Sequence, residues 1–180
     1  MTLPPRIAIA PRTDHASAKT VWDGDSAILQ TTFEYSPLPS TPRQETLRDQ
    51  LDQRLGVRGR IPRVVLGDLD IAYRDDRRLE SIELRTSVGS WQRGSVDDVP
   101  ADAPNAWITF DVPFDENGIF SLDLPVSITW DAVADRLSLQ FSSSAASRWN
   151  KLADAAAVGM SEDGTLVEMR LAGVEIRAAG

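Results

Sequence analysis

The chain lacks cysteine altogether and has one histidine, two lysines and no long apolar run among its 180 residues. The absence of cysteine excludes disulfides, thiolate catalysis and zinc–thiolate sites. His15 lies in a polar N-terminal stretch, so we expect a solvated side chain rather than the base of a Ser-His-Asp relay. No window approaches the roughly 20 apolar residues of a membrane span, and the N-terminus has no signal-peptide core. We therefore expect a cytoplasmic bacterial protein that does not interact with membranes.

Acidic residues outnumber basic ones, 27 against 19, which gives a net charge of -8 and a pI near 4.6. This balance opposes binding to nucleic acid or to an anionic membrane, and it favours a basic protein as the partner. Hydrophobic residues make up 42% of the chain and charged residues 26%, as in ordinary folded domains. The length is that of one domain with a substantial core.

Two parts of the sequence match each other. Residues 20–23 (TVWD) match residues 128–131 (ITWD), and the strand ending at Leu29-Gln30 matches the one ending at Leu139-Gln140 with about two residues' difference in the turn. Residues 71–84 (IAYRDDRRLESIEL) lie over residues 158–171 (VGMSEDGTLVEMRL) without a gap. The chain is therefore interpreted as a pseudo-repeat of two related units.

Short runs of β-branched and aromatic residues, separated by Asp, Gly and Asn turns, predict a mainly β fold. We expect two related antiparallel β-meander units within one compact domain that spans residues 1–180. The predicted parts are a first unit at 17–88 with a helical insertion, a joining hairpin at 105–125 and a second unit at 126–178. Two finer predictions concern single segments. We expect residues 64–73 to form one strand, and residues 142–154 to form a short helix or a loop.

One amphipathic helix is predicted at about 41–56, across the sheet. Thr41 provides the N-cap and Pro42 the first helical position. The apolar stripe recurs every four residues and ends at a glycine stop. It consists of Leu47, Leu51 and Leu55.

The second unit resembles a small bacterial family known only as domain of unknown function 2283. The resemblance rests on Ile-Thr-Trp-Asp at 128–131, Ala134-Asp135, Leu-Ser-Leu at 137–139 and Glu-Asp-Gly-Thr-Leu-Val at 162–167. The chain departs from the family pattern with Glu-Met-Arg-Leu at 168–171, where the family tends to have Gly-Ile-Glu-Ile. The resemblance implies no activity, because the family has no established chemistry.

Acidic residues form the first group of candidate site residues. Asp23 with Asp25, and Asp68 with Asp70, are Asp-x-Asp pairs of the kind that binds Mg²⁺ or Ca²⁺. Turn formation is the stronger interpretation, and we predict no cofactor. A second set of carboxylates occupies matching hairpin tips in the two units and is a candidate for binding a partner. It consists of Asp75, Asp76, Glu162 and Asp163.

Tryptophans form the second group. Trp22 and Trp130 occupy equivalent places in the two units, as a repeated core position would. Trp91, Trp107 and Trp149 have no such explanation, and at least one of them is a candidate for a binding surface. Tryptophans and paired carboxylates also occur in sugar-cleaving sites, but nothing in their spacing here is specific to that chemistry.

Three functions are compatible with these observations. The first is a non-catalytic bacterial binding or interaction protein of unknown ligand. The second is an immunity protein or antitoxin that neutralises a basic toxin. The third is a carboxylate-dependent, possibly metal-dependent hydrolase, which would need Asp23, Asp25, Asp68 and Asp70 to meet in one cleft. A homodimer is also compatible, because strand edges can pair between subunits.

Overall fold

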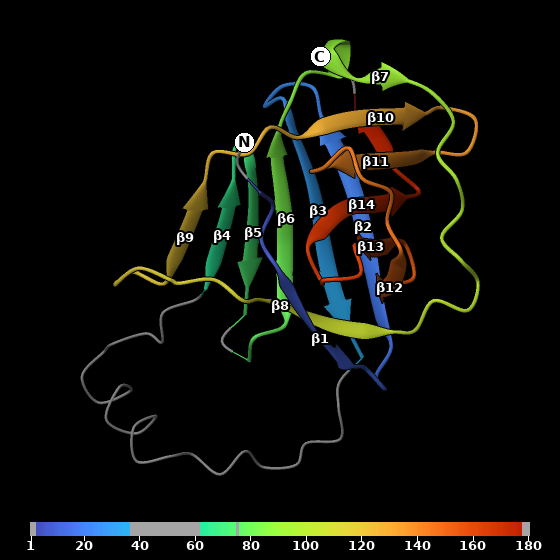
Figure 1. Cartoon of the computed structure of the whole chain (residues 1–180). Helices are drawn as coiled ribbons and strands as arrows, with labels where there is room; N and C mark the ends of the chain where they lie inside the picture. Colours follow the sequence, from blue (N-terminus) through green and yellow to red (C-terminus); the bar gives the residue numbers. More distant parts are fainter. Residues whose placement is uncertain (1–2, 37–61, 75, 178–180) are drawn as a thin grey trace.

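The computed structural model describes residues 3–36, 62–74 and 76–177, and its regular secondary structure consists almost entirely of strands. A seven-stranded sheet has the order β15-β2-β3-β6-β5-β4-β9, and a six-stranded sheet has the order β12-β13-β14-β11-β10-β7. Figure 1 shows the strands of one large sheet running across those of the other, in the manner of an orthogonal β-sandwich. The mainly β fold predicted from the sequence is confirmed.

The strands are short, and the described residues contain a single three-residue 3₁₀ helix, η1 (Val88–Ser90). The strands of the seven-stranded sheet are β15 (Glu175–Arg177), β2 (Ala16–Asp23), β3 (Ile28–Tyr35), β6 (Leu79–Arg85), β5 (Leu69–Tyr73), β4 (Arg63–Leu66) and β9 (Ile119–Leu122). Those of the six-stranded sheet are β12 (Arg148–Ala153), β13 (Ala156–Met160), β14 (Leu166–Ala172), β11 (Arg136–Gln140), β10 (Ser127–Asp131) and β7 (Gln92–Arg93). A separate ribbon pairs β1 (Ile7–Pro11) with β8 (Ala106–Phe110).

Each large sheet contains the same five-stranded unit. In chain order, the first two strands form a hairpin and the next three form a meander whose last strand returns beside the hairpin. The orders β2-β3-β6-β5-β4 and β10-β11-β14-β13-β12 are therefore identical. Register agrees as well, since Ile71 pairs with Ile82 in one unit and Val158 with Met169 in the other. Both meanders carry a register shift at the same place, so the ungapped match of residues 71–84 with 158–171 holds in three dimensions.

The sequence match at the first hairpin needs a correction. Trp22 pairs with Leu29, and Trp130 pairs with Leu137, so Leu29 corresponds to Leu137 rather than to Leu139. The hairpins align without a gap. Their turns also share a left-handed residue, Ala27 with φ 54° and Asp135 with φ 49°. The sequence match was wrong by two residues because Leu137 and Leu139 both fit the pattern. A shift of two residues along a strand leaves the same face buried.

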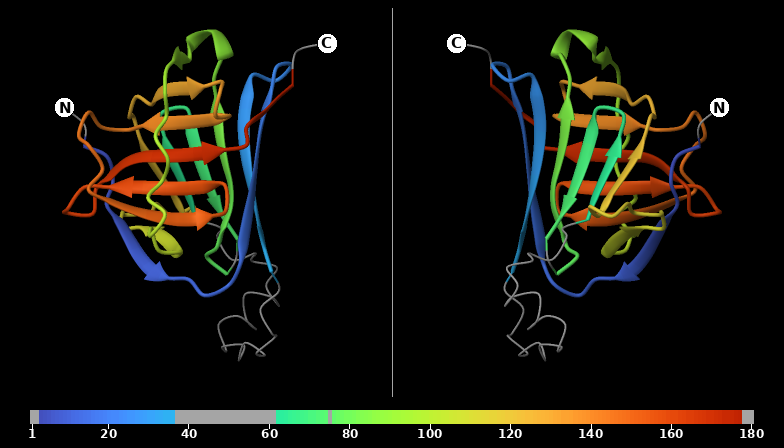
Figure 2. Two further views of the ribbon diagram at one scale, coloured as in Figure 1. Left: turned by 90° about the vertical axis from the view of Figure 1, so that its right-hand side faces the viewer. Right: turned by 90° about the vertical axis from the view of Figure 1, so that its left-hand side faces the viewer.

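The two units exchange their following strands. β7 follows the first unit along the chain but pairs in parallel with β10 of the second. β15 follows the second unit but pairs in parallel with β2 of the first, and Figure 2 shows this red strand beside the blue one. The strand that follows each unit therefore joins the sheet of the other unit.

The core fills the space between the large sheets, because each strand there turns alternate apolar side chains inward. Its fully buried members come from both units and include Leu29, Leu69, Ile71, Leu137, Met169 and Leu171. Trp91 lies between the two equivalent tryptophans, with its ring centroid 6.0 Å from that of Trp22 and 6.1 Å from that of Trp130. The β1–β8 ribbon adds Ile7, Ile108 and Phe110 to the same core.

Three segment predictions are wrong. Residues 105–125 do not form a hairpin, because β8 pairs with β1 and β9 pairs with β4. Residues 64–73 form two strands instead of one, since the chain turns at Gly67, which has φ 58°. Residues 142–154 contain β12 rather than a helix or loop alone. The predicted helix at 41–56 lies outside the described residues. Within those residues, no helix is long and apolar enough to cross a membrane.

Candidate binding site

Residues 94–105, the strap, cross the outer face of the six-stranded sheet (Figure 2, left). The strap is irregular, and basic side chains of the sheet hold its backbone. Arg170 Nη1 donates to the carbonyls of Asp97 and Asp98 at 2.9 and 3.0 Å. Lys151 Nζ donates to the carbonyl of Ala101 at 2.9 Å. The strap is therefore fixed to the sheet by charged groups that bind carbonyl oxygens.

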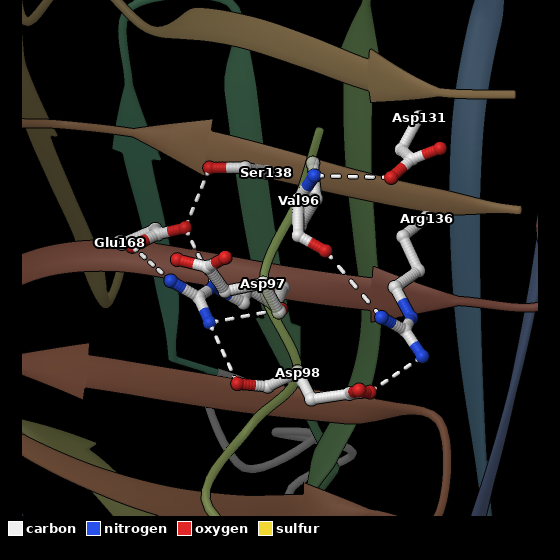
Figure 3. A network of polar contacts seen from close by, with 8 residues as sticks. Val96, Asp97, Asp98, Asp131, Arg136, Ser138 and Glu168 are labelled. Carbon is white, nitrogen blue, oxygen red and sulfur yellow. Dashed lines mark hydrogen bonds and ion pairs between the residues drawn. The ribbon is translucent and has the colours of Figure 1, made fainter. Parts of the chain in front are cut away.

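A buried carboxylate orients Arg170. Glu168 is 8% exposed, and its two oxygens accept from Arg170 Nε at 2.8 Å and Nη2 at 3.3 Å. Ser138 Oγ also donates to Glu168, at 2.7 Å (Figure 3). Because both charges have partners, their burial does not leave an uncompensated ion, and Arg170 has a fixed direction.

The N-terminal end of the strap, around Val96, is held at the β10–β11 hairpin. The Val96 N–H donates to Asp131 Oδ2 at 3.1 Å, while Arg136 donates to the Val96 carbonyl and forms an ion pair with Asp98 (Figure 3). The backbone hydrogen bonds from Val96 and then Ala134 lower the pKa of Asp131. This carboxylate therefore stabilises both its own turn and the strap.

Trp149, one of the three predicted binding tryptophans, lies at the other side of the strap and is half-buried. The Arg170 guanidinium lies 4.1 Å from its ring centroid, within the range of a cation–π contact. Its indole also lies over Gly159, where an added Cβ would come within 3.0 Å of the ring. The glycine therefore leaves room for the ring to lie flat against β13.

A groove of about 430 Å³ opens beside Trp149, between the strap and β12. Its apolar lining comes from Ile9, Pro100, Pro104, Trp149 and Met160. The consecutive residues 147–150 form one wall, so the edge of β12 itself borders the groove. A groove of this size is in the range of ligand sites.

The acidic hairpin tips lie in different environments. Glu162 is exposed. Its turn lies next to β12, since Arg148 Nη2 donates to the Glu162 carbonyl at 2.7 Å. Asp163 accepts from Ser161 Oγ and Thr165 N–H, and these bonds lower its pKa to about 2. In the first unit, Asp76 forms an ion pair with Arg78 at 3.1 Å. Asp75 lies outside the described residues.

The other two predicted tryptophans do not join this site. Trp91 is 6% exposed and belongs to the core. Trp107, half-buried on β8, packs on Tyr35 with ring centroids 5.0 Å apart. The Arg12 and Arg78 guanidinium groups lie 5.7 and 5.3 Å from its ring. Trp107 is therefore part of an arginine–aromatic cluster where β1, β3 and β8 meet.

The four aspartates considered for metal binding are not brought together. Asp23 accepts from Asp25 N–H and Ser26 Oγ within its own turn, which lowers its pKa. Asp70 forms an ion pair with Arg63. Asp68 lies at the same end of the sheet as Asp23, but β3 and β6 separate their strands by about 14 Å, at roughly 4.8 Å a step. In the ranges that the structure describes, no three His, Asp or Glu side chains are grouped to hold a metal ion.

Sequence reasoning selected Trp149 and Glu162 but missed β12, which carries Trp149 and, through Arg148, contacts the turn of Glu162. The segment before β12 is rich in serine and alanine, and these residues hid the strand signal. Trp149 and Lys151 alternate with the buried Asn150 and Leu152, and this alternation was the pattern that could have revealed it.

A comparison with models of known protein families finds no match, and neither does a comparison with curated protein sequences. The resemblance of the second unit to the family of unknown function stays a prediction.

Proposed function

We propose that this protein is a non-catalytic interaction protein of the bacterial cytoplasm whose ligand is another protein. The observation that carries the proposal is the groove beside Trp149. It combines a half-exposed aromatic side chain, two prolines and an exposed strand edge, which is the composition of a protein-recognition surface rather than of a reaction centre.

The roles of the polar groups support a non-catalytic function. Arg136, Lys151 and Arg170 bind strap carbonyls, and Glu168 orients Arg170. Asp131 accepts from its own turn and from the strap. These groups stabilise the fold around the groove, so they are already engaged before any ligand binds.

A basic partner fits the net charge of the chain, and the groove itself is lined by one acidic and one basic side chain, Asp102 and Arg148. The chain carries a net charge of -8, and Glu162 and Asp102 are exposed at the site. Among the described residues, the Glu162 carboxylate has no ion-pair partner. A basic partner of this kind is what an immunity protein or antitoxin would neutralise, so this narrower function is our second candidate.

The test is native mass spectrometry of the untagged protein isolated from its own host, in three forms. We expect the wild type to carry a stoichiometric basic protein and Trp149→Ala to lose it. The control Phe114→Ala removes another partly exposed aromatic side chain, 39% exposed and outside the groove, and should retain the partner. A bare wild-type monomer or a homodimer would contradict the proposal, and a retained metal ion would favour the hydrolase instead.

A further inference from the structure

We propose that the open edge of β12 binds an extended segment of a basic partner protein as an additional parallel strand. This inference rests on the proposed function and specifies how the partner binds. The added strand would occupy the place that β9 occupies in the other large sheet.

The internal repeat identifies the unfilled position. β4 of the first unit corresponds to β12 of the second, and β9 pairs in parallel with all four residues of β4. On β12, the only such pairing among the described residues is the parallel bridge between Asn105 and Lys151. The edge of β4 is therefore covered by a paired strand, whereas the equivalent edge of β12 has a single bridge among the described residues.

The backbone of β12 presents its hydrogen-bonding groups at this edge. The Lys151 N–H donates to the Pro104 carbonyl at 2.8 Å, away from β13. Because backbone groups alternate between the two sides of a strand, the N–H and C=O of Trp149 point to the same edge. Before Pro104 the strap forms no strand pairing with β12 among the described residues, because the Ala103 N–H instead donates to the Pro100 carbonyl within a turn. The groove lies in the space that this turn leaves.

Side chains around the edge define the segment that fits. The apolar groove accepts an apolar side chain, as β9 offers with its sequence IFSL. The β13–β14 tip lies at the start of β12, where Arg148 donates to the carbonyls of Ser161 and Glu162. A parallel segment begins at that end, next to the turn that carries the exposed Glu162. The Arg148 guanidinium beside it is bound to the carbonyls of this turn, whereas the Glu162 carboxylate is left to pair with a basic residue of the segment. The segment is therefore apolar with lysine or arginine at its N-terminal end.

The experiment uses the full chain and a synthetic peptide, KKGIFSLG, with blocked ends. Titration is followed by amide NMR spectra and by tryptophan fluorescence. We expect shifts concentrated at residues 147–151 and 100–104. A peptide of the same sequence with N-methyl groups on alternate residues keeps the side chains but loses the strand hydrogen bonds, so it should bind at least about tenfold more weakly. Because the protein is unaltered, this comparison does not depend on a variant folding.

Glu162→Gln tests the direction of the strand. It should weaken binding about threefold at low salt, whereas the matched control Glu116→Gln, at another exposed turn, should have no effect. Moving both lysines to the C-terminal end of the peptide should abolish the dependence on Glu162. Equal binding of the N-methylated peptide, shifts confined to another edge, or no binding would overturn the inference. So would concentration-dependent self-association at residues 147–151 without peptide, since a second copy would then be the occupant.

The two proposals fail in different ways. If the host partner is captured and binds Trp149→Ala normally, the interaction function stands and the β12 edge is not the site. If the wild-type protein captures no partner, the interaction function itself is wrong.

Discussion

Replacement of Trp91 tests how the two units are joined. The side chain is 6% exposed, makes edge-on contacts with Trp22 and Trp130, and donates from Nε1 to Thr86 Oγ1 at 2.9 Å. Burial loss and the remaining cavity cost about 3–5 kcal/mol for Trp→Ala. The two aromatic contacts, each worth about 0.5–1.5 kcal/mol, are part of this loss and place it in the upper half of that range. We expect Trp91→Ala to lower the free energy of unfolding by about 4–5 kcal/mol, a large fraction of ordinary domain stability.

Urea unfolding followed by far-UV circular dichroism measures this change, because the readout does not rely on the tryptophan being replaced. Trp91→Phe keeps an aromatic ring but removes the hydrogen bond from the indole N–H to Thr86 Oγ1, and we expect a loss of about 1–2 kcal/mol. Trp149→Ala, at a half-exposed position, should lose less than about 2 kcal/mol. Because the units exchange β7 and β15, all variants should unfold in one transition. A loss below about 1.5 kcal/mol for Trp91→Ala, or separate transitions for the two halves, would refute the reasoning.

Three further predictions concern single turns and the strap. Arg77 has φ 64° where the equivalent turn of the second unit has glycine, so Arg77→Gly should raise the free energy of unfolding by about 0.5–1 kcal/mol; an unchanged urea midpoint would contradict this. Asp131→Ala should release the strap and speed hydrogen exchange at the Val96 amide several-fold, while equal exchange would mean that this bond does not hold it. The carboxyl of Asp163 should titrate near pH 2 by NMR; since its pKa is depressed, the stabilisation of its turn is complete above about pH 4 and is lost as the pH falls toward 2. A measured pKa near the ordinary 3.8 would contradict the turn geometry.

Local patterns in the sequence determined the strand-rich fold and the repeat. Alternating apolar residues with Asp and Gly turns define β5–β6 and β13–β14, because each hairpin is stabilised by contacts between neighbouring strands. The same logic identified Trp22 and Trp130 as equivalent core positions. It also selected Trp149 and Glu162 as candidates for binding, although each for a separate reason.

Only the tertiary structure decided which strands lie side by side across long sequence separations. The predicted joining hairpin failed because β8 pairs with β1 and β9 with β4, and no local pattern encodes partners so distant in the sequence. The exchange of β7 and β15 likewise depends on parallel pairing between distant segments, which has no turn signal. Trp91 was a candidate for binding until that exchange placed it between the two units. The groove beside Trp149 likewise depends on the tertiary structure, because it lies where the strap turns between Pro100 and Ala103 at the edge of β12.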